Sequence, residues 1–274
     1  MEVNTNHMEY LQWYINIGIN EFIEDNSIDR TMLTESTSSP TVSSLTGNAS
    51  ESLIKKADSK VTIPSTGTIE ALKNAKDIAE QINTLDELKE ALEKFDGLSL
   101  SRTASQIIFA EGISSSKVML IGDTPGANED RAGRAFIGAS GQLLDKMLNA
   151  IGLSREENIY LTYLINWYPP GNRLPTESEI SLCMPFIQKH IELIKPEIII
   201  CLGDITAKTL MQTKQSITRI HGKWENYSSD NLEKPIPAVA LFRPEYLIAS
   251  PAQKGKAWAD LLKIKSKIAE LGFN

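Results

Sequence analysis

Apolar runs alternate with amphipathic stretches over the last two thirds of the chain. Four runs are apolar over nearly their whole length, which is typical of strands buried on both faces; they cover residues 118–121, 159–162, 197–202 and 238–242. Helical spacing follows each run, at residues 141–150, 176–194, 204–211 and 253–270. Thr176 and Glu179 stand three residues apart at the start of the second helix, as in a capping box. This alternation predicts a three-layer αβα fold around a central four-stranded parallel sheet.

Two helices are expected ahead of the first strand. Segment 85–95 repeats apolar residues at three- and four-residue steps after a capping position at Thr84, and another helix begins near Thr68. We interpret residues 68–97 as a helical lead-in to one α/β domain that covers 68–274.

The N-terminal part of the chain has a different character. Residues 9–24 place large apolar side chains near helical spacing, so a short amphipathic helix is expected within segment 1–30. Segment 31–67 holds 16 Ser or Thr among 37 residues and few large apolar ones, a composition that buries too little surface to order itself. We predict a disordered linker there, and the acidic helix that it tethers is a possible docking element for a basic protein partner or for the domain itself.

Charge is distributed unevenly along the chain. The net charge is −7, but residues 98–274 alone sum to +2, so the acidity belongs to the N-terminal segments. A faintly basic domain permits nucleic acid binding without indicating it. No apolar run approaches the length of a membrane span and no signal peptide opens the chain, so a cytoplasmic location is expected.

The loops that follow the strands carry the candidate chemistry, because ligands of parallel sheets bind beyond the carboxyl ends of the strands. After the first strand comes a Gly-Pro-rich turn and then a ring between glycines, with candidate residues Gly122, Asp123, Thr124, Pro125, Gly126 and Phe136. Segments 167–173 and 217–224 join cations to aromatic or rigid residues, and Arg243 follows the fourth strand. Each feature also has a purely structural interpretation as a tight turn, a core ring, a connector or a surface ion pair.

Several motifs in order carry a resemblance to a known family. GDTPGANEDRAGRAFIG–GQLLD, YPPGNRLPT–EI–C–PF, ITRIHGKW and FRPEYL resemble the motifs of the family 4 uracil-DNA glycosylases, which show GEAPG–ED–GRPFVG–GQLLD, RPPGNR–PT–EI–C–PF, GKW and HPAYL. The likeness covers about residues 95–265. It implies a parallel four-stranded sheet with flanking helices, and base excision from uracil-containing DNA by a monomer that flips the target nucleotide into a pocket.

The resemblance assigns roles by position. Asp123 and Arg243 stand at catalytic positions, where the family has a motif-one acid and a histidine that stabilises the departing uracil anion. Phe136 stands where an aromatic ring stacks on uracil, and Tyr163 where an asparagine reads the base edge, with Asn166 as an alternative reader. The pocket is completed by Gly122, Thr124, Pro125 and Gly126. Expected DNA contacts are Gly171, Asn172, Arg173, Arg219, His221, Lys223 and Pro244.

The chain departs from the family at its iron–sulfur cluster. The family usually holds the cluster through four cysteines, but here only Cys183 falls on such a position, while Trp167 and Leu98 stand at two others. Cys201 lies inside an apolar strand. Two cysteines cannot supply four thiolates, so we expect no cluster and no other cofactor or metal.

Three functions therefore compete. The leading hypothesis is a uracil-DNA glycosylase of base excision repair, in which Arg243 keeps a cation and Asp123 a carboxylate where the chemistry needs them. A second is a catalytically degenerate member that binds DNA or a partner, because Tyr163 offers one hydroxyl where an amide offers a donor and an acceptor. A third is a glycosylase whose base preference has shifted to hypoxanthine or xanthine.

Overall fold

The computed structural model describes residues 66–273. The expected helix over residues 9–24 and the expected linker up to residue 65 lie outside the described residues. The first described helix, α2 (Thr66–Gln81), begins two residues before the position expected from the sequence. None of the helices in this described part is long and apolar enough to cross a membrane.

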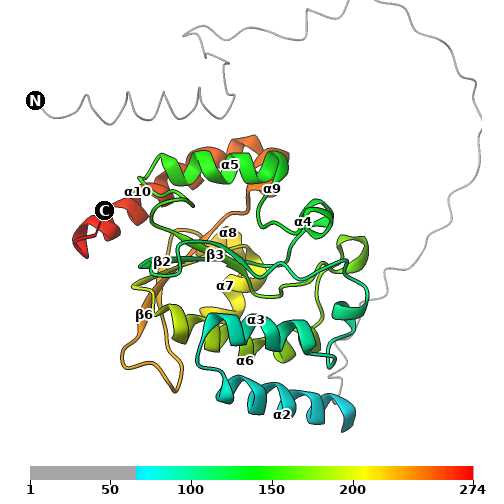
Figure 1. The fold of residues 1–274 in the computed structure, drawn as a ribbon. Helices are drawn as coiled ribbons and strands as arrows, with labels where there is room; N and C mark the ends of the chain where they lie inside the picture. Colours follow the sequence, from blue (N-terminus) through cyan, green and yellow to red (C-terminus); the bar gives the residue numbers. More distant parts are fainter. Residues whose placement is uncertain (1–65, 274) are drawn as a thin grey trace, which may run out of the picture.

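A six-stranded sheet forms the centre of the fold (Figure 1). Its strands are β1 (Ala110–Gly112), β2 (Val118–Gly122), β3 (Tyr160–Tyr163), β4 (Ile198–Leu202), β5 (Trp224–Tyr227) and β6 (Ile236–Leu241), in the spatial order β1-β3-β2-β4-β6-β5. The inner four are parallel, which confirms the expected parallel core. The outer two pair antiparallel at the edges and were not predicted. Both are short and partly exposed, so neither shows the apolar run that reveals a buried strand.

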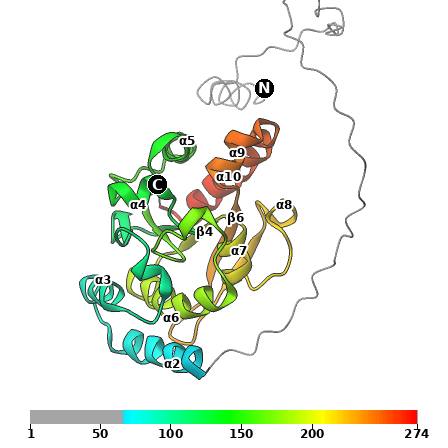
Figure 2. The ribbon, with the colours of Figure 1, turned by 90° about the vertical axis from the view of Figure 1, so that its right-hand side faces the viewer.

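Helices cover both faces of the sheet. Between strands lie α4 (Ala127–Ala132), α5 (Gly138–Asn149), α6 (Glu177–Ile194), α7 (Asp204–Leu210) and the one-turn α8 (Ile217–Ile220). After the last strand come α9 (Pro244–Ala249) and α10 (Lys254–Glu270). Figure 1 shows α5, α9 and α10 above the sheet and α6 below it, and the rotated view keeps the two groups apart (Figure 2). The expected three-layer arrangement is thus observed, and α5 begins three residues earlier than expected.

Alternation along the buried strands explains why nearly every position is apolar. Successive side chains point to opposite faces, so Met119 and Ile121 of β2 join the core under α6 and α7, whereas Val118 and Leu120 join the core under α5 and α10. The neighbouring strand β4 divides its side chains in the same way. A parallel strand with a helix layer on each face leaves few positions for a polar side chain, and the buried Thr162 of β3 donates its hydroxyl to the Phe109 carbonyl.

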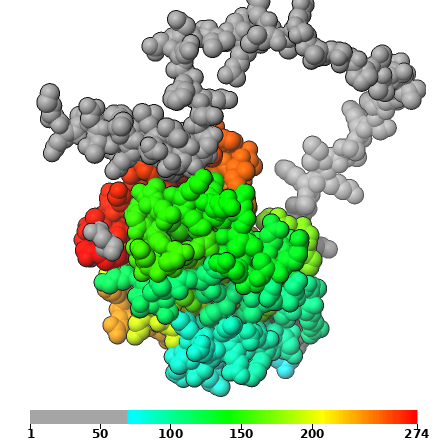
Figure 3. Space-filling view, turned by 45° about the horizontal axis from the view of Figure 1, so that its top comes forward, coloured from blue at the N-terminus to red at the C-terminus, as the bar shows by residue number. Residues whose placement is uncertain are grey.

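The lead-in helices pack outside α6. α2 and α3 (Leu85–Lys94) both contact α6. α2 adds Ala75 and Ala79 to the core cluster that includes the buried side chains of α6, and α3 adds Leu88 and Leu92. Thr84 caps α3 and accepts a hydrogen bond from the Glu87 backbone, as expected from the sequence. The space-filling view shows this cyan lead-in continuous with the green body of the domain (Figure 3).

The topology opens a crevice beside β2. The chain passes from β2 through α5 on one face to β3, and from β4 through α7 on the other face, so the loops after β2 and β4 diverge. Such a switch point leaves a crevice beyond the carboxyl ends of the strands, where α/β proteins bind ligands. The candidate residues from the four strand ends therefore meet at this edge.

Candidate active site

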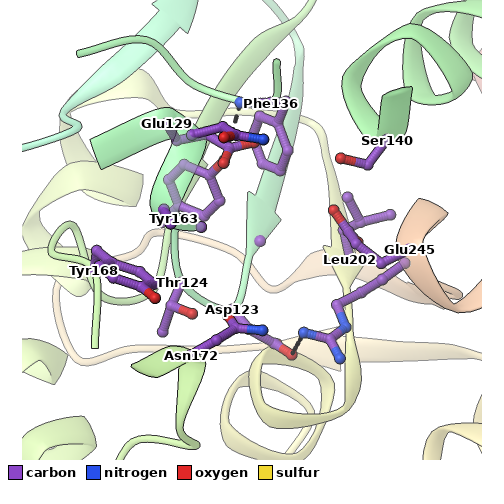
Figure 4. Close-up of a pocket in the computed structure, with 15 residues that line it drawn as sticks. Asp123, Thr124, Glu129, Phe136, Ser140, Tyr163, Tyr168, Asn172, Leu202 and Glu245 are labelled. Carbon is purple, nitrogen blue, oxygen red and sulfur yellow. Dashed lines mark hydrogen bonds and ion pairs between the residues drawn. The ribbon is translucent and has the colours of Figure 1, made fainter. Parts of the chain in front are cut away.

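A cavity of about 350 Å³ lies at the carboxyl edge of the parallel strands. This volume falls within the range of about 300–1,000 Å³ for pockets that hold small ligands. Its lining residues come from the ends of β2, β3 and β4, from α4 and α5, and from the loop after β6 (Figure 4). Asp123, Phe136 and Arg243 all line it, so the three side chains on which the sequence interpretation depends converge on one cavity.

Asp123 is held in a buried seat directly after β2. Only 4% of its surface is exposed, and its Oδ1 accepts a hydrogen bond of 2.8 Å from the Thr206 backbone N–H. Burial raises the pKa of this carboxyl, and the Thr206 hydrogen bond and the Arg243 charge oppose that rise only in part. Gly203 leaves room for the seat, because a Cβ there would lie 2.3 Å from Asp123 Oδ2.

Arg243 supplies the positive charge at the mouth of the cavity. It stands between β6 and α9, and its guanidinium lies 3.8 Å from Asp123 Oδ2. Its side chain is 44% exposed, so the cation keeps access to solvent and to a ligand. Pro244 occupies the first turn of α9, where its missing N–H costs nothing, and it is buried. That burial leaves Pro244 little surface for the DNA contact expected of it.

Phe136 and Tyr163 form a stacked pair on the cavity wall (Figure 4). Their ring centroids are 4.4 Å apart with an interplanar angle of 24°, and the Tyr163 hydroxyl accepts a 2.9 Å hydrogen bond from the Phe136 backbone N–H. Burial raises the pKa of Tyr163 well above its usual value, so its hydroxyl stays protonated. A side chain at Gly122 would meet both rings at 2.9 Å, and glycine is therefore required beneath the pair.

Of the other residues predicted to form the pocket, some line the cavity and others are buried behind it. Gly122, Thr124 and Gly126 line the cavity as expected, whereas Pro125 is buried and does not line it. Asn166 is not part of the lining, because its buried amide donates to the backbone carbonyls of residues 108 and 109. It cannot read a base edge in this position.

The loop after β3 contributes only in part. Asn172 lines the cavity together with Tyr168, and Gly171 is exposed beside them. Arg173 instead forms a two-pronged ion pair with Glu179, with distances of 2.9 and 2.7 Å, which lowers the pKa of that glutamate. The arginine thereby fastens the loop to the start of α6.

The cationic segment before β5 lies outside the cavity lining. Arg219 and Lys223 are exposed on either side of the end of α8. His221 is partly buried, and its Nδ1 lies 2.6 Å from the carboxylate of Asp260, which is almost fully buried on α10. Contacts of these residues with DNA stay a prediction.

Several lining residues were not singled out from the sequence. They are Ala127, Asn128, Glu129, Ser140, Tyr168, Leu202 and Glu245. Glu129 is buried, and its Oε1 accepts a 3.2 Å hydrogen bond from the Ile137 backbone N–H, so it braces the Phe136 loop from inside the pocket. Its place in the ED pair of the first motif was the one available signal.

The positions of the family's cluster ligands form an apolar core. Leu98, Trp167 and Cys183 are all buried in the core cluster under α6. Burial raises the pKa of Cys183 and of Cys201, which disfavours the thiolate form that binds metals. Within residues 66–273 no three His, Cys, Asp or Glu side chains are grouped so that they could hold a metal ion. The residues present do not fit a four-thiolate cluster.

A small cavity with a buried carboxylate, a guanidinium and aromatic rings at the edge of a parallel sheet defines a candidate enzyme site for a flat polar ligand. The model of the uracil DNA glycosylase superfamily matches residues 109–262. Because this match covers more than half of the sequence, the chain belongs to that superfamily.

Individual relatives agree. The type-4 uracil-DNA glycosylase of Saccharolobus solfataricus is 36% identical over 173 residues, which span 60% of this chain and 80% of that protein. The type-4 uracil-DNA glycosylase of Thermotoga maritima is 30% identical over 188 residues, 68% of this chain and 95% of that protein. Both aligned segments are longer than the part of the chain that runs from the first to the last strand of the sheet.

Proposed function

We propose that this chain is a uracil-DNA glycosylase, which hydrolyses the N-glycosidic bond of uracil in DNA. The observation that carries the proposal is the convergence of Asp123, Phe136 and Arg243 on one base-sized cavity. Family membership supports it. A base inside a duplex cannot reach such a cavity, so the target nucleotide is extruded into it.

Charge separation is the chemical problem of this reaction. As the bond between the sugar C1′ and the base N1 breaks, its electron pair leaves with uracil and the sugar becomes cation-like. The Asp123 carboxylate stabilises that cation and orients the water that adds to C1′, and the proton that this water loses neutralises the uracil anion. The Arg243 guanidinium donates hydrogen bonds to the uracil oxygen on which negative charge develops. The 3.8 Å pair in the free protein keeps both charges at the same edge of the cavity.

At position 163 the chain has a tyrosine where the family has an asparagine that hydrogen-bonds the edge of the base. Tyr163 uses its hydroxyl oxygen to accept the Phe136 N–H, so it acts mainly as part of the wall. The base stacks against the part of Phe136 that faces the cavity. Asn172 and Asn128 are exposed amides on the lining, and their donor and acceptor groups suit a base edge.

DNA outside the pocket is held through the loops that surround the mouth. Arg219 and Lys223 are exposed cations suited to phosphate contacts, and His221 lies between them in the sequence with its Nδ1 held by Asp260. Gly171 and Arg173, in the loop that Glu179 fastens, are proposed to contact the DNA backbone as well. Contacts of this kind position the duplex without reading its sequence.

We further propose that apolar packing of Leu98 and Trp167 against Cys183 takes the structural place of the family's iron–sulfur cluster. All three belong to one core cluster that also receives α6. The enzyme is then a cofactor-free monomer of the cytoplasm. We also propose that residues 68–274 form the glycosylase domain, that residues 31–67 are a disordered linker, and that segment 1–30 contains a helix that docks on a protein partner.

Two other functions are favoured by one observation, the stacking of Tyr163 on Phe136. A degenerate member would bind uracil-containing or abasic DNA without turnover, because the edge-reading amide is gone from this position. A glycosylase with shifted preference would release hypoxanthine or xanthine in place of uracil. A panel of oligonucleotides carrying each base separates both from the leading proposal.

The test is release of free uracil from single- and double-stranded oligonucleotides by the full chain. Arg243→Ala removes the guanidinium, and kcat is expected to fall by about 100- to 1,000-fold, the usual cost of losing one donor to a developing anion. Arg243→Lys should recover part of that loss, because the charge returns without the fork of donors. Lys94→Ala on the distant helix α3 serves as the control and should leave kcat unchanged. Absence of uracil release by the wild-type chain, with Arg243→Ala indistinguishable from it, rejects the enzyme.

A further inference from the structure

The loop that carries Phe136 has all four backbone polar groups of residues 135 and 136 bound by side chains. The Ala135 N–H donates to Glu111 Oε1 at 3.1 Å, and the Phe136 N–H donates to the Tyr163 hydroxyl at 2.9 Å. The Ala135 and Phe136 carbonyls accept from Arg155 at 2.8 and 2.7 Å. Four side-chain hydrogen bonds on two consecutive loop residues far exceed what a connector needs.

Phe136 needs this support because its backbone is strained. Its φ of 49° lies in the left-handed region, which a bulky side chain rarely adopts. Strain of this kind persists only where the surroundings hold it in place, and it gathers at functional sites. The contacts that oppose relaxation come from Glu111 on β1 and from Arg155 and Tyr163, before and on β3, so they lie on both sides of Phe136 in the sequence.

Arg155 is the centre of this support. Its guanidinium also binds the carboxylates of Glu111 at 2.9 Å and Asp145 at 2.6 Å, and its carbon Cζ lies 6.0 Å from the centre of the Phe136 ring. The side chain is only 11% exposed. A planar fork of five donors can serve two carboxylates and two carbonyls at once, which a lysine ammonium cannot.

We propose that Arg155 and Glu111 are positioning residues that preassemble the Phe136 stacking platform before a base arrives. Neither residue lines the cavity, so they act on the base only through Phe136. Tyr163 belongs to the same assembly, which gives a reason for a phenol where the family has an asparagine. The inference rests on the proposed function, because a platform matters only if a base stacks on it.

The chain offers a matched control for this proposal. Arg134 pairs with the same carboxylate, Glu111, at 3.1 Å, but its side chain is 68% exposed, and no bond to the backbone of the Phe136 loop is among its contacts in the described structure. Removing Arg134 therefore perturbs the charge beside Glu111 and leaves the bonds to the loop in place.

The experiment compares Arg155→Met and Arg155→Lys with Arg134→Gln in the full chain. Three quantities are measured: amide hydrogen exchange at Ala135 and Phe136, inhibition by free uracil, and the Kd for DNA with an abasic site. For Arg155→Met we expect exchange about tenfold faster and inhibition by uracil about tenfold weaker, the size of effect for lost charge-assisted hydrogen bonds. The Kd for abasic DNA should stay within about twofold, because no base stacks in that complex. Arg155→Lys should lie between, and Arg134→Gln should match the wild type.

Each outcome decides the proposal. Unchanged exchange at Phe136 in Arg155→Met overturns it, as does an equal weakening of uracil inhibition and abasic DNA binding, which indicates general damage. If Arg155→Met does not fold, Arg155→Lys and Glu111→Gln are judged by the same ratios. A wild-type chain that releases no uracil rejects the proposed enzyme, while the exchange measurement still decides whether Arg155 holds the platform.

Discussion

Asp123 has an unusual environment for a carboxyl group whose proposed role requires the charged form. Burial opposes its ionisation, whereas the Thr206 N–H and the Arg243 cation favour it, and burial dominates. The folded protein therefore holds the Asp123 proton at pH values where the unfolded chain has released it. An ionised Asp123 costs stability, which is the kind of cost expected of a functional group and not of a structural one.

The pH dependence of uracil release should report this carboxyl. If the ionised form is the active one, kcat/KM falls as pH drops through the raised pKa of Asp123, so the acid limb lies above the usual value of 3.8. Single-turnover rates across a pH series measure the limb. A rate that stays flat down to about pH 4 would contradict the role given to Asp123.

The same group gives a stability prediction with a definite sign. The free energy of unfolding should fall as pH rises from the unfolded pKa of Asp123 to its raised folded pKa, because only the unfolded chain has then lost the proton. Asp123→Asn removes this titration and retains an acceptor for the Thr206 N–H. Thermal unfolding should show a higher Tm for the variant at neutral pH, together with loss of uracil release.

The sequence predicted which residues belong to the site in several cases, but it predicted the direction of their side chains in fewer. Asp123, Phe136 and Arg243 follow strands or stand in motifs, and the parallel topology alone brings such positions together. The direction of Tyr163 depends on a hydrogen bond to a residue 27 positions earlier, which no local pattern contains. The hydrogen bonds between the backbone of the Phe136 loop and the side chains of Glu111 and Arg155 could not be predicted for the same reason.

At the scale of elements, the capping box of α6 shows how local sequence sets a boundary. The Thr176 hydroxyl accepts a hydrogen bond from the Glu179 N–H, and the Glu179 carboxylate accepts hydrogen bonds from the Thr176 N–H and from Arg173. One short motif thus starts the longest helix of the described chain and fastens the loop that reaches the cavity.

Thr176→Ala should lower the free energy of unfolding by about 1 kcal/mol, the typical cost of losing a helix cap. Denaturant unfolding measures the change. Ser181→Ala on the same helix is the control, because the Ser181 hydroxyl bonds only within the helix, to the Glu177 carbonyl, and alanine favours a helix interior. An equal loss in both variants would show that the cap contributes nothing of its own.

The spacing of apolar residues predicted the long helices and the four parallel strands, but it did not predict the two edge strands, β1 and β5. β5 pairs on one side only, and two of its four residues are exposed, so it resembles a loop in sequence. Tertiary pairing, and not local preference, makes such a segment a strand. Edge strands of this kind become visible only once the central sheet is known.

For the whole molecule, charge predicts weak attraction to DNA. The described domain is close to neutral, so the phosphate contacts proposed for it depend on a few exposed cations such as Arg219 and Lys223. Each neutralised phosphate contributes about 0.9 to the slope of log affinity against log salt.

Lys223→Ala should therefore weaken binding to all DNA sequences alike and reduce the salt slope by about 1. Fluorescence anisotropy over a range of salt concentrations measures both effects. Lys94→Ala, with a side chain 73% exposed on the far lead-in helix, should leave the slope unchanged. A slope that responds equally to both substitutions would point to a diffuse charge effect.

The two cysteines have a practical consequence. Cys183 and Cys201 are the whole thiol content of the chain, and burial keeps both in the unreactive protonated form. Leu174, 71% exposed two residues beyond the lining residue Asn172, is a position where Leu174→Cys would accept a maleimide dye alone. A single fluorophore beside the mouth could then follow, in real time, each arrival and departure of a damaged strand.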